Sequence, residues 1–158
     1  MNANRELPPI KVTTSDYNSL LFTAVLARRL GDQNAEFLIS ELTRASVCHP
    51  DDLPEHVVST NCRVIYRLDE EPRTHACLLV HPKDLLFPGV ELSVITPLGA
   101  ALLGLQLGDR MPYKALDDQS NHEVLVEGIG MRFVGEGMPS RNLRTELFGG
   151  HFERDAPH

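Results

Sequence analysis

Tryptophan is absent from this 158-residue chain, and aromatic residues make up only 6% of it. Because proteins hold nucleic-acid single strands largely by stacking bases on aromatic side chains, this scarcity argues against a stacking platform. Cations are also scarce, since 15 Lys and Arg stand against 22 Asp and Glu, for a net charge of −7. A protein that coats nucleic acid needs surplus cations to displace counterions from phosphates. The composition therefore excludes a general nucleic-acid coat.

Long hydrophobic runs are missing as well. The first residues, MNANRELPPIKVTTSD, contain no apolar core of a secretory signal. The uncharged segment Leu92–Gly108 is interrupted by Pro97 and is shorter than the roughly 20 apolar residues of a membrane-spanning helix. The three cysteines include no CxxC pair, which is typical of buried thiols in a reducing compartment. We expect a cytoplasmic protein that does not contact a membrane.

The N-terminal third has the periodicity of two helices. Apolar residues recur at three- and four-residue spacing over 17–27, which places them on one helix face. Thr13 or Thr14 can cap this helix, and Gly31 can end it. A second helix is predicted over 35–47, with the apolar rhythm of a coiled-coil seam. Helices joined by so short a turn should run antiparallel as a hairpin.

A period of two replaces this pattern from residue 58 onward. Even positions over 58–68 are mostly apolar and odd positions mostly polar, which predicts a half-buried strand. Residues 75–81 follow a charged turn and are predicted to form a second strand, which pairs with the first as an antiparallel hairpin. Further strands are predicted at 90–95, 105–113 and 123–133, and a short helix at 97–103. The expected fold class is α+β.

Four segments follow from these patterns. We expect a flexible lead-in at 1–12, the helical hairpin at 13–49, an antiparallel β domain with one short helix at 50–135, and a tail at 136–158. Within the tail, 140–148 is predicted to form a small helix.

No enzyme motif is complete. The chain lacks a GxxxxGK[ST] phosphate loop and a GxSxG elbow, and the glycines of 128–130 lack the third glycine and following helix of a dinucleotide loop. Residues of zinc-ligand type occur without the short paired spacing of a zinc site: Cys48, His49, Cys62, Cys77 and His81. We expect no catalytic residue, no cofactor and no metal.

Asp32 and Glu36 lie at the predicted turn between the two helices. A carboxylate at the tip of a projecting hairpin can be delivered into another protein's cavity and help to hold a metal ion there. The same residues also fit an ordinary capped turn, so the residues alone leave both interpretations open.

The segment LSVITPLGAALLGLQLGDRMPY, residues 92–113, closely resembles the C-terminal signature of the GreA/GreB transcript cleavage factors. That signature is a run of S-V-x-S-P-x-G-x-A-L-L-G-x-x-x-G-D type, and Thr96 stands at its second serine. The strand regions 57–68 and 75–82 are also similar to the family. The run 40–61 looks like the junction between helix and domain in the Rnk branch, the regulators of nucleoside diphosphate kinase. The positions in register are Ser93, Val94, Pro97, Gly99, Ala101, Leu102, Leu103, Gly104, Gly108 and Asp109.

The resemblance implies an FKBP-like C-terminal domain without isomerase activity and a coiled-coil hairpin that enters the secondary channel of bacterial RNA polymerase. It implies docking on the polymerase rim through the loop formed by Thr96, Pro97, Leu98 and Gly99. DNA would be contacted only indirectly, through the transcription complex. The implied function is non-catalytic regulation of transcription, with an indirect effect on nucleoside diphosphate kinase.

The resemblance also bears on transcript cleavage. Cleavage factors carry two acidic residues on a long hairpin, in a tip that resembles G-D-L-K-E-N-A-E, and these stabilise the second catalytic magnesium of the polymerase. Here Asp32 matches the first acid, the second is missing, and the arms are shorter. One carboxylate binds magnesium more weakly than a positioned pair. We therefore expect a projecting hairpin that plugs the channel without strong stimulation of cleavage.

Two alternatives stay open at this point. A peptidyl-prolyl isomerase needs several converging aromatic side chains, and the candidates are Tyr66, Phe87, Tyr113 and Phe133. A generic interaction module would use the apolar seam of 35–45 to bind another partner or a second copy of the chain.

Overall fold

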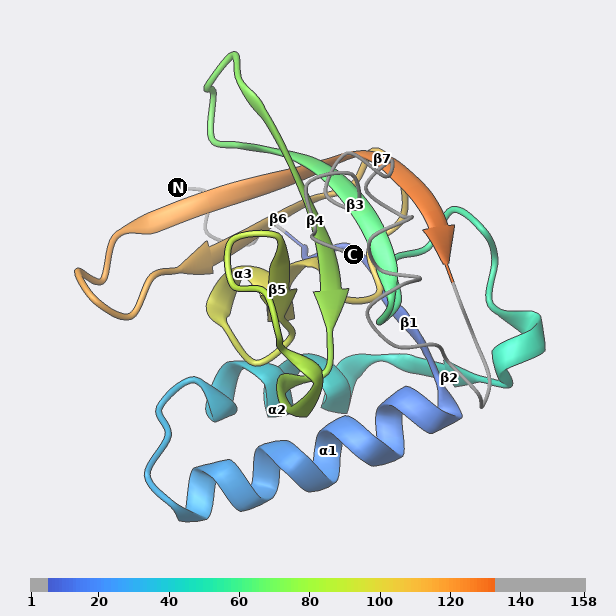
Figure 1. Cartoon of the computed structure of the whole chain (residues 1–158), viewed down its shortest axis with the longest axis vertical. Helices are drawn as coiled ribbons and strands as arrows, with labels where there is room; N and C mark the ends of the chain where they lie inside the picture. Colours follow the sequence, from blue (N-terminus) through green and yellow to red (C-terminus); the bar gives the residue numbers. More distant parts are fainter. Residues whose placement is uncertain (1–5, 133–158) are drawn as a thin grey trace, which may run out of the picture.

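The computed structural model describes residues 6–132, in which two N-terminal helices lie across one end of a domain built on a five-stranded sheet (Figure 1). The predicted α+β class is confirmed. The tail at 136–158, with its predicted helix at 140–148, and Phe133 lie outside the described residues. In chain order the elements are β1 (Lys11–Thr13), α1 (Thr14–Arg29), α2 (Ala35–Arg44), β2 (Ser46–Cys48), the 3-10 helix η1 (Pro50–Asp52), β3 (Cys62–Leu68), β4 (Thr74–Val80), the 3-10 helix η2 (Pro82–Asp84), β5 (Glu91–Ser93), α3 (Pro97–Leu102), β6 (Arg110–Lys114) and β7 (Asn121–Arg132).

The two N-terminal helices begin and end for local reasons. Thr13 Oγ1 accepts the Asp16 N–H at 3.0 Å, which satisfies one of the amide donors left open at the start of α1. Gly31 closes the turn after α1 at φ 92°, a conformation that glycine adopts without strain. α2 ends at Arg44 rather than at Val47, because the following residues extend into β2.

The helical hairpin lies across one end of the sheet domain and does not project from it. α2 is placed between α1 and α3 (Figure 1). Its Ala35, Leu38 and Leu42 are completely buried and belong to the same core as the sheet. Burying a leucine contributes about 1.5–3 kcal/mol, so these side chains hold the hairpin down. The prediction of a projecting plug is therefore wrong, because the apolar face of α2 is covered by α3 as well as by α1.

Polar contacts fasten α1 to the sheet domain. The Asp16 carboxylate accepts the Thr60 hydroxyl at 2.8 Å and the Thr60 N–H at 3.3 Å. Burial raises the pKa of Asp16, while the hydrogen bonds from Thr60 act in the opposite direction. Farther along the helix, Thr23 Oγ1 lies 3.3 Å from His81 Nε2. The hairpin is thus anchored at the start and in the middle of α1.

The expected flexible lead-in is also wrong for its last residues. Lys11–Thr13 form β1, which pairs in parallel with β2. Ile10 and Val12 are buried, at 3% and 1% exposure, and Lys11 N–H donates to the Gly104 carbonyl at 3.2 Å. This strand, which joins the hairpin to the sheet domain, was not predicted because its short apolar stretch lies among charged residues.

The five-stranded sheet has the order β5-β4-β3-β7-β6. The predicted alternation holds in β3, where Cys62, Val64 and Tyr66 are buried. β3 pairs antiparallel with β4, as predicted, and with β7. β6 begins only at Arg110, because Asp109 Oδ2 accepts the Gln106 N–H at 2.9 Å and closes a turn before it. Among residues 6–132, no helix is long and apolar enough to cross a membrane.

A buried ion pair secures the end of α2. Glu41 is 2% exposed, and its carboxylate lies 2.8 Å from Arg44 Nη2. The same guanidinium donates to the Pro8 carbonyl at 2.7 Å through Nη1. Arg44 therefore links α2 to the segment that precedes β1.

Replacing Glu41 with glutamine should lower the free energy of unfolding by about 2 kcal/mol, because Arg44 then stays partly buried without a carboxylate. Chemical denaturation would measure the change. Glu36→Gln is the matched control, since the ion pair of Glu36 with Arg28 is exposed and should contribute less than about 1 kcal/mol. Equal effects of the two substitutions would contradict the prediction.

Candidate functional site

The residues at the start of α3 form the centre of the candidate site. Thr96 caps the helix by accepting the Gly99 N–H on Oγ1 at 3.0 Å, and its hydroxyl donates to the Ser93 carbonyl at 2.8 Å. Pro97 occupies the first turn, where its missing N–H is not needed. The Thr-Pro-x-Gly sequence thus holds the helix start close to β5.

Gly99 is needed for this close approach. A Cβ at position 99 would collide with the Ser93 carbonyl oxygen and lie 2.9 Å from the Ser93 carbonyl carbon and from Thr96 Oγ1. Because two of these atoms belong to the backbone, they cannot turn away as a flexible side chain would. Gly99 is therefore buried under the site and shapes it without facing a partner.

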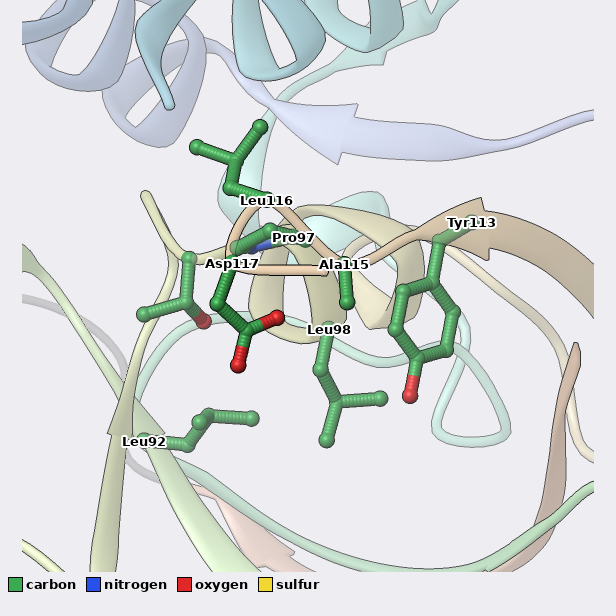
Figure 2. A pocket seen from close by; sticks show the side chains of 8 residues that line it. Leu92, Pro97, Leu98, Tyr113, Ala115, Leu116 and Asp117 are labelled. Atoms are coloured by element: carbon green, nitrogen blue, oxygen red, sulfur yellow. The ribbon is translucent and has the colours of Figure 1, made fainter. Parts of the chain in front are cut away.

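A pocket of about 320 Å³ opens beside the start of α3 (Figure 2). It lies between β5, α3 and the turn that connects β6 to β7. Apart from Asp117, its walls are apolar or uncharged. The lining residues are Leu92, Thr96, Pro97, Leu98, Tyr113, Ala115, Leu116 and Asp117.

The polar groups of the pocket are few. Burial, with a smaller contribution from the negative charges of Asp69 and Glu71, raises the pKa of Tyr113 to about 12. The Tyr113 hydroxyl therefore stays protonated at neutral pH. Pockets of this kind, apolar with a few placed polar groups, are typical binding sites.

The structure brings three of the four predicted docking residues to one surface. Thr96, Pro97 and Leu98 line the pocket, whereas Gly99 is buried beneath it. Sequence reasoning missed the opposite wall, formed by Tyr113 and by residues 115–117. That wall reaches the site because β6 pairs with β7 at the sheet edge, and no local signal in the sequence marks this pairing.

The two acids of the helix turn have structural partners. Asp32 Oδ1 accepts the Asn34 N–H at 2.9 Å, and Glu36 lies 3.8 Å from Arg28. In the part of the chain that the structure describes, no group of three or more His, Cys, Asp or Glu side chains could hold a metal ion. Asp32 thus closes the turn before α2, while the N-cap residue Asn34 makes no side-chain capping hydrogen bond.

The aromatic candidates for an isomerase pocket do not gather at the α3 pocket. Tyr66 stacks on His75 with ring centroids 5.3 Å apart, and Tyr113 stacks on His122 at 5.4 Å. Of the three candidates within residues 6–132, Tyr113 alone lines the pocket. The apolar seam of α2 is likewise occupied within the molecule, since Leu38 and Leu42 are buried.

An ion pair fixes the strand ends near Tyr113. His122 Nδ1 lies 2.9 Å from Asp69 Oδ2, and Asp69 Oδ1 accepts the Glu123 N–H. The hydrogen bond with Asp69 raises the pKa of His122 and lowers the pKa of Asp69. At mildly acidic pH His122 is therefore positively charged and Asp69 negatively charged.

This pair predicts the direction of a pH dependence. The contribution of His122 to stability is complete below its unfolded-state pKa and is lost as the pH rises through its higher folded-state pKa. The contribution of Asp69 is lost as the pH falls through its lowered pKa. NMR titration should place the His122 pKa above 6.5, and Asp69→Asn should return it toward that value. An unchanged His122 pKa in this variant would contradict the assignment.

Comparison with known proteins shows which solved fold this chain resembles. No protein-family model matches the chain. The fold is similar to that of a prokaryotic transcription elongation factor GreA/GreB from Nitrosomonas europaea, with a TM-score of 0.61 and 27% identity over 77% of this chain and 99% of that one. The fold and the α3 site thus define a GreA/GreB-like protein.

Sequence relatives narrow the class. The chain is 36% identical over 93 residues to the regulator of nucleoside diphosphate kinase of Escherichia coli K12. The aligned region covers 59% of this chain and 68% of that protein. The match to the protein of the same name from Shigella flexneri has the same identity and coverage. The chain belongs to the family of the regulator of nucleoside diphosphate kinase, Rnk, as the sequence resemblance predicted.

Proposed function

We propose that this chain is a non-catalytic regulator of bacterial transcription that binds RNA polymerase near its secondary channel. It docks through the pocket face formed by Thr96, Pro97 and Leu98, and it does not strongly stimulate transcript cleavage. It acts in the cytoplasm, where transcription takes place, and approaches DNA only as part of the transcription complex.

The observation that carries this proposal is the similarity to the GreA/GreB factor along nearly all of that factor's length. The surface that the sequence signature assigns to docking contains an apolar pocket, with Leu98 half-buried at its rim. Apolar pockets that bury an anchoring side chain dominate the affinity of protein interfaces. A partner anchored here would therefore contact the signature residues directly.

The position of the hairpin supports the expected lack of cleavage activity. Ala35, Leu38 and Leu42 would have to leave the core for the hairpin to reach outward. Asp32 provides one carboxylate, which already accepts a hydrogen bond within its own turn. A single acid held in this way is a weak magnesium ligand.

Occupancy of the polymerase surface would be enough for regulation. A protein bound there excludes other factors that use the same surface, in proportion to concentration and affinity. An effect on nucleoside diphosphate kinase, which the name of the relatives suggests, then follows indirectly through transcription.

Two assays test the proposal. The full chain should co-elute with core RNA polymerase in size-exclusion chromatography at micromolar concentration. It should leave a backtracked transcription complex uncleaved under conditions in which a GreA/GreB cleavage factor acts. Strong cleavage that disappears in Asp32→Ala, or no co-elution, would contradict the proposal.

A further inference from the structure

The pocket beside α3 combines apolar walls with one negative charge. Asp117 is the charged residue among the eight that line it (Figure 2). Its carboxylate is directed toward the space between Leu92 and Leu98. Asp117 Oδ1 accepts the Asp118 N–H at 2.7 Å, the two aspartate side chains interact, and Asp117 is exposed. The Asp117 carboxylate is therefore accessible to a ligand.

The neighbouring charges reinforce this polarity. Hydrogen bonds from Ser120 lower the pKa of Asp118, so this residue adds a negative charge to the turn at neutral pH. Of the cationic residues on β6, Arg110 pairs with Glu123 at 3.3 Å, and Lys114 does not line the pocket. A cation from outside the molecule would meet no like charge among the lining residues.

We propose that this pocket binds an arginine side chain presented by the partner protein. The aliphatic part of the arginine lies on Leu92 and Leu98, and its guanidinium donates to the Asp117 carboxylate. A guanidinium is more weakly hydrated than an ammonium, so it enters an apolar site at a lower desolvation cost. The open pocket, of about 320 Å³, has room for a long side chain. This inference rests on the proposed function and specifies the polymerase segment that the site recognises.

A small probe tests the pocket without polymerase. N-acetyl-arginine amide, titrated into the ¹⁵N-labelled full chain, should shift the amide signals of Leu98 and Tyr113 in a saturable way. N-acetyl-citrulline amide has nearly the same shape without the charge and should bind about tenfold more weakly, as expected for the loss of a charge-assisted hydrogen bond. Asp117→Asn should remove the difference. Equal binding of the two amides to the unmodified chain would overturn the proposal.

Polymerase binding separates this inference from the proposed function. Asp117→Asn should weaken binding to core polymerase by about tenfold. Asp52→Asn, an exposed change in η1 with the same effect on net charge, should leave binding unchanged. If polymerase binds Asp117→Asn as tightly as the unmodified chain, the arginine inference is wrong and docking stands. If polymerase does not bind the unmodified chain, the proposed function is wrong, and the amide titration decides the chemistry of the pocket.

Discussion

Replacing Gly99 with alanine should lower the free energy of unfolding by about 3 kcal/mol or more, at the upper end of overpacking effects. The added Cβ would overlap the Ser93 carbonyl oxygen, and relief would require the link between β5 and α3 to move as a unit. The same link carries the two hydrogen bonds of Thr96. Urea denaturation followed by circular dichroism measures the loss.

Gly31→Ala is the matched control for this prediction. Gly31 has a positive φ of 92°, but a Cβ there would meet nothing within 4 Å. The substitution therefore adds only backbone strain, about 1–2 kcal/mol. A Gly99→Ala variant that is as stable as Gly31→Ala would show that the corner under the site is not closely packed.

Replacing Leu98 with glutamate should weaken binding to core RNA polymerase by about thirtyfold or more, as expected for the loss of a central anchoring contact. Leu98 lies at the start of α3 and lines the pocket together with Leu92 and Tyr113. A carboxylate at this position would have to be desolvated beside Asp117. Surface plasmon resonance with immobilised polymerase measures the change.

Two further variants keep this result interpretable. Leu116→Glu changes the opposite wall of the pocket at a more exposed position and should also weaken binding. Leu107→Glu introduces the same charge at a 52% exposed leucine outside the pocket and should bind like the unmodified chain. Equal binding of all three variants would place the polymerase contact elsewhere on the molecule.

The regular elements were predictable from the sequence because their signals are local. The threonine at the start of α1, the glycine after it and the alternation in β3 each act within a few residues. The placement of the hairpin was not predictable in this way. An apolar face on α2 shows that the helix is buried, but the choice between α1 alone and α3 as an added partner depends on tertiary packing.

The candidate site was predictable only in part. The run from Ser93 to Gly99 contains a threonine that can cap α3 and a glycine that allows close approach to Ser93. Its residues could therefore be assigned to one site. Asp117 belongs to a charged turn that looks like any solvated loop. It reaches the pocket because of the pairing of β6 with β7, a contact between segments whose register is set by the folded sheet.

The docked hairpin changes how this family member would act on polymerase. Its helices contribute Leu20, Leu38 and Leu42 to the core. The sheet domain and the helices therefore share one core, and the proposed docking surface is the α3 face. Under the proposed function, regulation by this protein would then act through surface occupancy rather than by reaching into the polymerase.

A competition titration tests this account most directly. Fluorescently labelled full-length protein is titrated with core RNA polymerase, and an unlabelled GreA/GreB cleavage factor is then added. The account predicts a saturable rise in anisotropy at micromolar polymerase, which the cleavage factor reverses. The absence of saturable binding, or a complex that the cleavage factor does not displace, would contradict docking on the shared surface.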